Sequence, residues 1–295
     1  MNIGVIGGGS VGLFISSYLN THHSVRVYVR REEQCELLNY NGITNKQTGE
    51  NAPIEALLLE NMKKEDLLII CVKQHQVKNI LPMIKQKNEN TPLLFLQNGM
   101  GHIELISHFN QPVYLGVNNH GTLRENDCIF SHTGKGGLVF AHFNTSEGDA
   151  NRIGSILNNS SFPVRVEKDW IGLLNKKLIV NAVINPLTAL FKVSNGEILS
   201  NRYLYDFAKG LCYEAAESLD SNFDKNWRNV KKIAEATSQN TSSMLKDIIE
   251  KRPTENEAIS GYIISKSKKE LVYTTFMYKA IQALEYKNIR TPFEA

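Results

Sequence analysis

The chain has 295 residues, of which 42% are hydrophobic and 21% charged, and its formal net charge at pH 7 is +3. This length suits two domains, and the apolar content is enough to build their cores. So small a net charge gives no reason to expect nucleic acid or an anionic membrane as a partner. No apolar run is long enough to span a bilayer, and the glycine-rich start does not resemble a secretory signal.

The cysteine pattern points to a cytoplasmic protein. The four cysteines are widely separated and form no CxxC pair, so reduced thiols are expected: Cys35, Cys71, Cys128 and Cys212. The eight histidines show no metal-binding spacing such as HExxH, and we therefore expect no metal site.

The first half of the chain alternates β-rich runs with amphipathic segments such as Val11–Leu19 and Val77–Lys87. The early β-rich runs are almost continuously apolar, which is typical of a parallel sheet covered on both faces. The alternating order predicts an α/β fold with a doubly wound, Rossmann-type sheet. The expected strands are Ile3–Ile6, Val25–Val29, Leu67–Val72, Leu93–Leu96, Val113–Val117, Cys128–His132 and Leu138–Ala141.

A glycine loop follows the first predicted strand. "IGVIGGGSVGLFISSYL" places Gly7, Gly9 and Gly12 in G-x-G-x-x-G spacing, between a strand and a helix. Glycines there permit a tight turn, the close approach of a pyrophosphate and close packing of the helix on the sheet, while the helix N-terminus offers N–H groups to the phosphates. The loop therefore predicts dinucleotide binding by Gly7, Gly8, Gly9, Ser10, Val11 and Gly12.

The end of the second predicted strand bears on which dinucleotide is bound. NAD-binding folds usually place an acid there for the ribose 2′-hydroxyl, whereas "SVRVYVRREE" places Arg30. A guanidinium can hold the 2′-phosphate of NADP through a charge-assisted fork. Because Glu32 and Glu33 follow closely, a solvated charge cluster that opens the next helix is the alternative. NADP is the favoured prediction.

Another glycine-rich segment, "TGKGGLV" at 133–139, lacks the full length of a phosphate-binding P-loop and the Ser or Thr that would follow it. We interpret it as a hairpin turn between two strands.

Strand patterns almost vanish after about Asp169, and long helical patterns follow one another. Asp169 is a plausible N-cap for a helix over Trp170–Phe191. The predicted domains are therefore an NADP-binding Rossmann domain over residues 1–168 and an all-α substrate and catalytic domain over residues 169–295.

The predicted helix over Trp170–Phe191 carries a polar stripe. Lys177, Asn181 and Asn185 lie four residues apart and share one face of an otherwise apolar helix, whereas Lys176 is out of register with both asparagines. Buried polar groups need partners, so the stripe faces either a polar ligand or a structural Lys–Asn network. Pro186 follows Asn185 and is expected to kink the helix there.

Six motifs together resemble those of the ketopantoate reductase family, in order along nearly the whole chain. They are "GGGSVG", "CVKQHQV", "LQNGMG", "NKKLIVNAVINPLTAL…NGE", "NTSSMLKDI" and "RPTENEAISGYI". The resemblance implies reduction of 2-dehydropantoate to (R)-pantoate by NADPH, a step in the biosynthesis of pantothenate and coenzyme A.

The resemblance also implies roles for particular residues. Lys177 looks like the general acid, while Lys73 and Thr122 would contact the cofactor. Asn98 and Glu255 would contact cofactor or substrate, although the family's usual T-E-I-D reads "TENEA" here, with Glu257 as the second acid. The residues that would hold the substrate are Asn181, Asn185, Asn195 and Ser243.

The chemistry of the reaction agrees with these residues. Hydride delivered to a ketone leaves an alkoxide, and a buried ammonium supplies both positive charge and a proton. Two other functions stay open: a related NADP-dependent oxidoreductase of 2-keto or hydroxy acids, and a catalytically silent NADPH sensor. The expected partner is a small 2-keto acid, and the chain is expected to act as a monomer or a homodimer.

Overall fold

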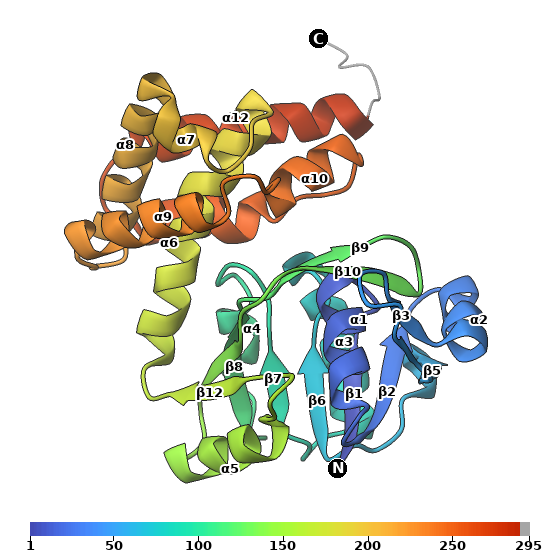
Figure 1. Ribbon diagram of the computed structural model, residues 1–295. Helices are drawn as coiled ribbons and strands as arrows, with labels where there is room; N and C mark the ends of the chain where they lie inside the picture. The colour runs from blue at the N-terminus through green and yellow to red at the C-terminus, as the bar shows by residue number, and fades with distance from the viewer. Residues whose placement is uncertain (290–295) are drawn as a thin grey trace. The chain divides into compact units, whose positions relative to one another are not determined.

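The computed structural model describes residues 1–289, which form two compact units (Figure 1). The first unit comprises Met1–Gln97 and His102–Leu174. The second comprises Asn98–Gly101 together with the described residues from Asn175 to Ile289. A loop of four residues from the first half of the chain is therefore grouped with the helices of the second half.

The first unit is built on an eight-stranded sheet, as the alternating pattern predicts. All neighbouring strands are parallel except β8 and β11, which run antiparallel. The doubly wound, Rossmann-type expectation is thereby confirmed. The order across the sheet is β12 (Val164–Glu167), β11 (Leu138–His142), β8 (Val113–Asn118), β7 (Leu93–Phe95), β6 (Leu67–Ile70), β1 (Asn2–Ile6), β2 (Ser24–Val29) and β5 (Glu55–Leu58).

Two neighbouring inner strands of this sheet, β6 and β1, show why its sequence is apolar. Every residue of β6 is buried, and so is every residue of β1 after Asn2. A strand covered on both faces can gain from an apolar side chain at each position, so the usual alternation disappears. The helices of this unit are α1 (Ser10–Leu19), α2 (Glu32–Asn41), α3 (Gln74–Lys87), α4 (Ile103–Ile106) and α5 (Glu147–Leu157), with a 3₁₀ turn at Leu59–Asn61.

A second, four-stranded sheet belongs to the same unit. Its order is β4 (Asn51–Ala52), β3 (Ile43–Asn45), β10 (Ile129–Gly134) and β9 (Gly121–Arg124). This sheet corrects the interpretation of residues 133–139 as a hairpin turn, which is wrong. The segment joins β10 to β11, but β10 pairs with β3 and β9 whereas β11 pairs with β8 and β12. The glycines therefore carry the chain from one sheet to the other.

The second unit is helical. Its first helix, α6, spans Trp170–Phe191 as predicted, although its residues up to Leu174 are grouped with the first unit. The Asp169 carboxylate accepts a hydrogen bond from the Gly172 N–H at 3.0 Å. The helix continues through Pro186 to Phe191, within its predicted bounds. The remaining elements are α7 (Glu197–Ser200), α8 (Arg202–Ser218), α9 (Phe223–Ala236), α10 (Ser243–Ile249), a π-helical turn η2 (Glu257–Gly261), α11 (Tyr262–Lys266) and α12 (Val272–Ile289).

A buried carboxylate joins α8 to the start of α12. Glu214 on α8 accepts hydrogen bonds from the backbone N–H groups of Tyr273 and Thr274, at 3.0 and 2.7 Å, and from the Thr274 hydroxyl at 2.7 Å. The first N–H groups of a helix have no partner within it, and the positive end of the helix dipole favours an anion there. Glu214 thus caps α12 from a neighbouring helix.

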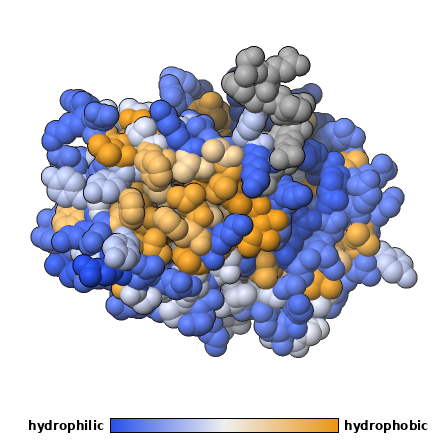
Figure 2. Space-filling view, turned by 90° about the horizontal axis from the view of Figure 1, so that it is seen from above, coloured by the Kyte–Doolittle hydropathy of each residue, from blue (hydrophilic) through white to orange (hydrophobic). Residues whose placement is uncertain are grey.

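Several large apolar side chains of the helical unit are exposed, among them Tyr203 and Tyr213 on α8 and Val272 and Phe276 on α12. Figure 2 shows hydrophobic residues gathered on the face that it turns toward the viewer. Among the helices of residues 1–289, none combines the length and the apolar character needed to cross a membrane.

Candidate active site

The glycine loop has the geometry of a dinucleotide-binding turn. Gly7 adopts a φ of +113°, and a Cβ on Gly12 would lie 1.8 Å from the Gly7 carbonyl oxygen, so α1 can begin this close to β1 only with glycine. A Cβ on Gly9 would meet nothing within 4 Å, which leaves its face open to a ligand. The loop therefore combines a tight turn, close packing and an open approach to the first turn of α1.

Other predicted cofactor residues lie at the same edge of the sheet. The neighbouring strands β6, β1 and β2 are parallel, so their carboxyl ends lie side by side. Gly7 follows β1, Arg30 follows β2, and Lys73 follows β6 as the N-cap residue of α3. Open α/β sheets bind ligands at the carboxyl edge, beside the point where the strand order reverses. That reversal occurs here next to β1.

Thr122 lies on β9 of the smaller sheet, opposite His132 of β10.

Hydrogen bonds link His120 and His132 to each other and to Tyr18. The Gly136 N–H donates to Nδ1 of His120 at 3.2 Å, so this nitrogen carries no proton. Nε2 of His132 lies 3.1 Å from the same Nδ1 of His120 and therefore donates to it as well. Nδ1 of His132 in turn accepts a hydrogen bond from the Tyr18 hydroxyl at 3.2 Å. Burial and the neighbouring His132 lower the pKa of His120 to about 4. Both rings are therefore neutral at pH 7.

Lys177 has the surroundings expected of a proton donor. It is partly buried on α6, whereas Lys176 is exposed. Burial lowers the pKa of the Lys177 ammonium to about 8, and the charge of Glu255 acts in the opposite direction. Desolvation disfavours the charged amine and the carboxylate favours it, so the balance leaves a pKa close to neutral pH. An acid with such a pKa is protonated at pH 7 and yet gives up its proton readily.

Glu255 is also bonded to Asn98, which comes from the loop Asn98–Gly101. The Asn98 side-chain amide donates to the Glu255 carboxylate at 3.0 Å. The loop rests on the π-helical turn: the Met100 N–H donates to the Ala258 carbonyl at 3.2 Å. Gly99, with a φ of +86°, approaches so closely that a Cβ would lie 2.3 Å from the same oxygen. The motif "QNGMG" and the stretch after "RPTENE" therefore meet in one unit.

The two acids of "TENEA" have different partners. Glu255 accepts a hydrogen bond from Asn98, and its charge raises the pKa of Lys177. Glu257 is exposed and accepts a hydrogen bond from the Tyr278 hydroxyl on α12. This division supports Glu255 as the acid of the candidate site.

Asn181 and Asn185 continue the face of Lys177 along α6, and Asn185 is only 6% exposed. Near it, the Thr188 hydroxyl contacts the Ser242 hydroxyl at 2.7 Å, and the Ser242 Oγ accepts from the Leu245 N–H to cap α10. Ser243 is the next residue, exposed at the first position of α10. Sequence reasoning did not identify Thr188 or Ser242, because nothing in the stripe or the "SSM" motif shows which serine turns toward α6.

Asn195 lies in the connection between α6 and α7. Its amide nitrogen donates to the Thr237 hydroxyl at 3.0 Å, and its backbone N–H donates to the Asn240 carbonyl at 3.0 Å. Its side-chain oxygen is buried and, among the described residues, finds no hydrogen-bond partner. The side-chain nitrogen of Asn195 thus holds Thr237, at the start of the loop that leads to α10. Its side-chain oxygen could accept a hydrogen bond from a hydroxyl group of a ligand.

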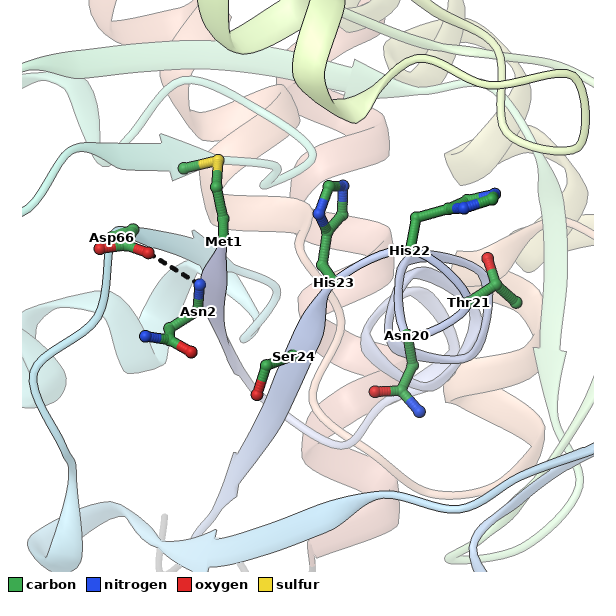
Figure 3. A pocket seen from close by; sticks show the side chains of 8 residues that line it. All are labelled: Met1, Asn2, Asn20, Thr21, His22, His23, Ser24 and Asp66. Carbon is green, nitrogen blue, oxygen red and sulfur yellow. Dashed lines mark hydrogen bonds between the residues drawn. The ribbon is translucent and has the colours of Figure 1, made fainter.

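One surface pocket lies at the opposite edge of the larger sheet from the glycine loop. It is lined by residues at the amino ends of β1, β2 and β6, including Asn2, Ser24 and Asp66 (Figure 3). The Asn2 N–H donates to the Asp66 carboxylate at 2.8 Å. Because α/β sheets bind cofactors at the carboxyl edge, this pocket is not the dinucleotide site. No group of three or more His, Cys, Asp or Glu side chains suited to a metal ion occurs within residues 1–289.

Two family models match the chain. The one described as "Ketopantoate reductase PanE/ApbA" matches residues 3–145, and "Ketopantoate reductase PanE/ApbA C terminal" matches residues 169–285. The 2-dehydropantoate 2-reductase of Bacillus subtilis (strain 168) is 40% identical over 292 residues, covering 97% of this chain and 98% of the relative. That of Listeria monocytogenes is 32% identical over 294 residues, covering 97% of each.

Solved structures agree with these matches. A Bacillus subtilis structure described as a probable 2-dehydropantoate 2-reductase superposes with a TM-score of 0.85 at 39% identity, covering 96% of this chain and all of the other. D-mandelate dehydrogenase with NADH and anilino(oxo)acetate gives a TM-score of 0.92 at 21% identity, covering 98% of this chain and 100% of the other. At that identity, the second likeness shows the fold alone.

Proposed function

Because the chain belongs to the ketopantoate reductase family, we propose that it reduces 2-dehydropantoate to (R)-pantoate with NADPH and that Lys177 supplies the proton. The observation that carries the proposal is the cluster of Lys177, Glu255 and Asn98 within the helical unit. Its members come from three motifs of the family. The charge of Glu255 raises the pKa of the Lys177 ammonium group against the effect of burial, and Asn98 donates to the Glu255 carboxylate.

The first unit fits a dinucleotide. Its glycine loop leaves room above Gly9, and α1 has no acidic residue in its first turn to oppose a phosphate. NADPH, when bound, supplies the hydride that reduces the ketone. Arg30 is exposed at the end of β2, where an acid would select the ribose hydroxyl of NAD. Its guanidinium supports a preference for the 2′-phosphate of NADPH, and Lys73 and Thr122 are proposed to contact the same cofactor.

The second unit supplies the proton. Addition of hydride to the ketone places negative charge on the former carbonyl oxygen, and an ammonium beside that oxygen stabilises the charge before protonating it. Lys177 meets this need because burial moves its pKa toward neutrality. Glu255 keeps the amine protonated at the pH of the cytoplasm, and Asn98 fixes the Glu255 carboxylate. We assign Glu255 and Asn98 to the environment of Lys177, in contact with substrate or cofactor.

Polar side chains near Lys177 are proposed to orient the keto acid. Asn181 and Asn185 share the face of Lys177 on α6, and Ser243 presents an exposed hydroxyl at the start of α10. The unsatisfied oxygen of Asn195 suits a hydroxyl of the substrate. Fixing the ketone in one orientation is worth several orders of magnitude in rate.

The test is a spectrophotometric assay of NADPH consumption against a panel of 2-keto acids, with wild type, Lys177→Ala and Lys176→Ala. We expect ketopantoate to have the highest kcat/KM and Lys177→Ala to lower kcat by about 10²–10⁴-fold, as for other positioned acids. Lys176→Ala is the matched control, because its side chain points about 100° away around the helix. Equal losses in the two variants would show that the lysine assignment is wrong.

The same assay separates the alternatives. Faster turnover of another 2-keto acid would identify a related oxidoreductase, and NADPH binding without turnover of any 2-keto acid would identify a sensor.

A ketopantoate reductase from Staphylococcus aureus with the same fold is described as dimeric. For this chain we propose a monomer or a homodimer, to be decided by light scattering. The cytoplasm is the proposed location, supported by the four free thiols.

A further inference from the structure

Two arginines that were not part of the predicted site converge on one carboxylate beside the glycine loop. Arg31 directly follows Arg30, and Arg124 ends β9 of the smaller sheet. Both guanidinium groups form ion pairs with the same oxygen, Oδ1 of Asp127. Their side chains remain 43% and 30% exposed, so both are accessible to solvent.

Hydrogen bonds fix this group against the cofactor loop. The buried Gln34 side chain donates to the Gly8 carbonyl at 2.8 Å and to the Asp127 carbonyl at 3.0 Å. The backbone N–H of Arg124 donates to the Ser10 hydroxyl at 3.1 Å, and Ser10 is the first residue of α1. The turn that carries Asp127 and the end of β9 are therefore tied directly to the glycine loop.

The charges of the group match those of a phosphate monoester. Three guanidinium groups and one carboxylate sum to +2, and a phosphate monoester carries about −1.5 to −2 at pH 7. Each guanidinium has five N–H donors in a fork that suits phosphate oxygens. Besides its ion pair with Asp127, Arg124 donates from Nε to the Asn126 carbonyl at 2.9 Å, which holds its guanidinium beside Asp127. Glu32 and Glu33 lie in the first turn of α2 and are exposed. Acids in a first turn stabilise the helix N-terminus, and this accounts for both residues without a role in phosphate binding.

We propose that Arg31 and Arg124, drawn together by Asp127, complete with Arg30 the site that takes the 2′-phosphate of NADPH. The position supports this assignment, because the ribose of a bound dinucleotide lies between the glycine loop and the end of the second strand. The preference for NADPH over NADH then depends on two elements far apart in sequence, the β2–α2 connection and the end of β9. This inference rests on the proposed use of NADPH.

The experiment measures the binding of 2′,5′-ADP and 5′-AMP by isothermal titration calorimetry, so it needs no turnover. The variants are Arg31→Gln and Arg124→Gln, with Arg165→Gln on β12 as the control. Arg165 is 72% exposed and pairs with Glu167 on its own strand. Each test variant should weaken 2′,5′-ADP about tenfold or more, because charge-assisted hydrogen bonds are lost, and should change 5′-AMP by less than about twofold. Arg124→Lys, which keeps the charge but loses the fork, should fall between.

Equal weakening of both nucleotides, or no weakening of either, would overturn the inference, as would selectivity lost only in Arg30→Gln. Thermal unfolding identifies any variant that fails to fold, and Arg124→Lys then takes its place. The proposed function is judged separately. If wild type reduces ketopantoate with NADPH while both test variants keep their nucleotide selectivity, only this inference fails. If the variants lose selectivity but wild type reduces no ketopantoate, the 2′-phosphate site stands and the proposed substrate is wrong.

Discussion

The amide of Asn98 donates to the carboxylate of Glu255 over 3.0 Å, although 157 positions separate them in the chain. The carboxylate also raises the pKa of Lys177 against the effect of burial. One side chain thus orients an acid that in turn keeps a lysine protonated.

Glu255→Gln should move the alkaline limb of the pH–rate profile to lower pH. Burial holds the pKa of Lys177 at about 8 and Glu255 opposes that shift, so without the carboxylate the ammonium loses its proton earlier. Activity that requires protonated Lys177 declines as pH rises through this pKa. The measurement is kcat/KM for ketopantoate between about pH 6 and pH 10. Glu257→Gln is the matched control, and a similar displacement in both variants would contradict the assignment of Glu255.

Gly99→Ala should damage the candidate site far more than Gly49→Ala. Both glycines have positive φ, +86° and +73°, so both substitutions carry the backbone penalty of about 1–2 kcal/mol. Only at Gly99 would the new Cβ strike another group, the Ala258 carbonyl oxygen at 2.3 Å, whereas at Gly49 it meets nothing within 4 Å. We expect kcat/KM to fall at least tenfold in Gly99→Ala and to stay within about twofold in Gly49→Ala. Equal kinetics in the two variants would show that the docking of this loop is unimportant for activity.

Mild acidification should destabilise the protein, and His120 should account for part of the loss. Its pKa is about 4 in the folded protein and 6.5 in the unfolded chain, so the unfolded state binds a proton that the folded state resists. The stabilising contribution is complete above pH 6.5 and is lost progressively as pH falls toward 4. His120→Gln keeps an acceptor for the Gly136 N–H and should make the melting temperature less dependent on pH in this window. His102, whose pKa burial also lowers to about 4, retains its own contribution. The exposed His108→Gln should leave the slope unchanged, and an unchanged slope in His120→Gln would rule out the mechanism.

Glu214→Ala should destabilise the helical unit. The variant leaves two backbone N–H groups and one hydroxyl at the start of α12 without their carboxylate partner. Because the site is buried, we expect a loss of about 2–4 kcal/mol in the free energy of unfolding, measured by urea titration. Glu217→Ala on the same helix is the control: its carboxylate is 38% exposed and pairs with Lys269, and exposed pairs contribute about 0–1 kcal/mol. Comparable losses in the two variants would mean that the cap on α12 adds little.

The sequence was sufficient for the parts of the fold that depend on local pattern. The continuous apolar runs of β1 and β6, the glycine loop and the helix Trp170–Phe191 were all predicted close to their observed bounds. The short strands β3, β4, β5, β9 and β12 were not, because each has only two to four residues and its pairing is set by distant partners. The hairpin interpretation of residues 133–139 failed for the same reason: local turn chemistry does not say which strands pair.

The same distinction between local pattern and distant contacts applies to the candidate site. The four-residue step from Lys177 to Asn185 is a property of one helix and could be found by periodicity. Three contacts of the site join distant segments: Asn98 with Glu255 across 157 positions, Arg31 with Asp127 across 96, and Thr188 with Ser242 across 54. No spacing rule reaches across such separations, so only the folded chain shows them.

The loop Asn98–Gly101 limits how the two halves of this protein can be exchanged. It lies in the first half of the sequence, yet it packs on the π-helical turn and its Asn98 donates a hydrogen bond to Glu255. A chimaera that joined residues 1–174 of one relative to the helices of another would bring together a loop and a turn that had diversified separately. Recombination at the apparent border of the helical half is therefore constrained, and a functional exchange would have to carry these four residues along with the helices.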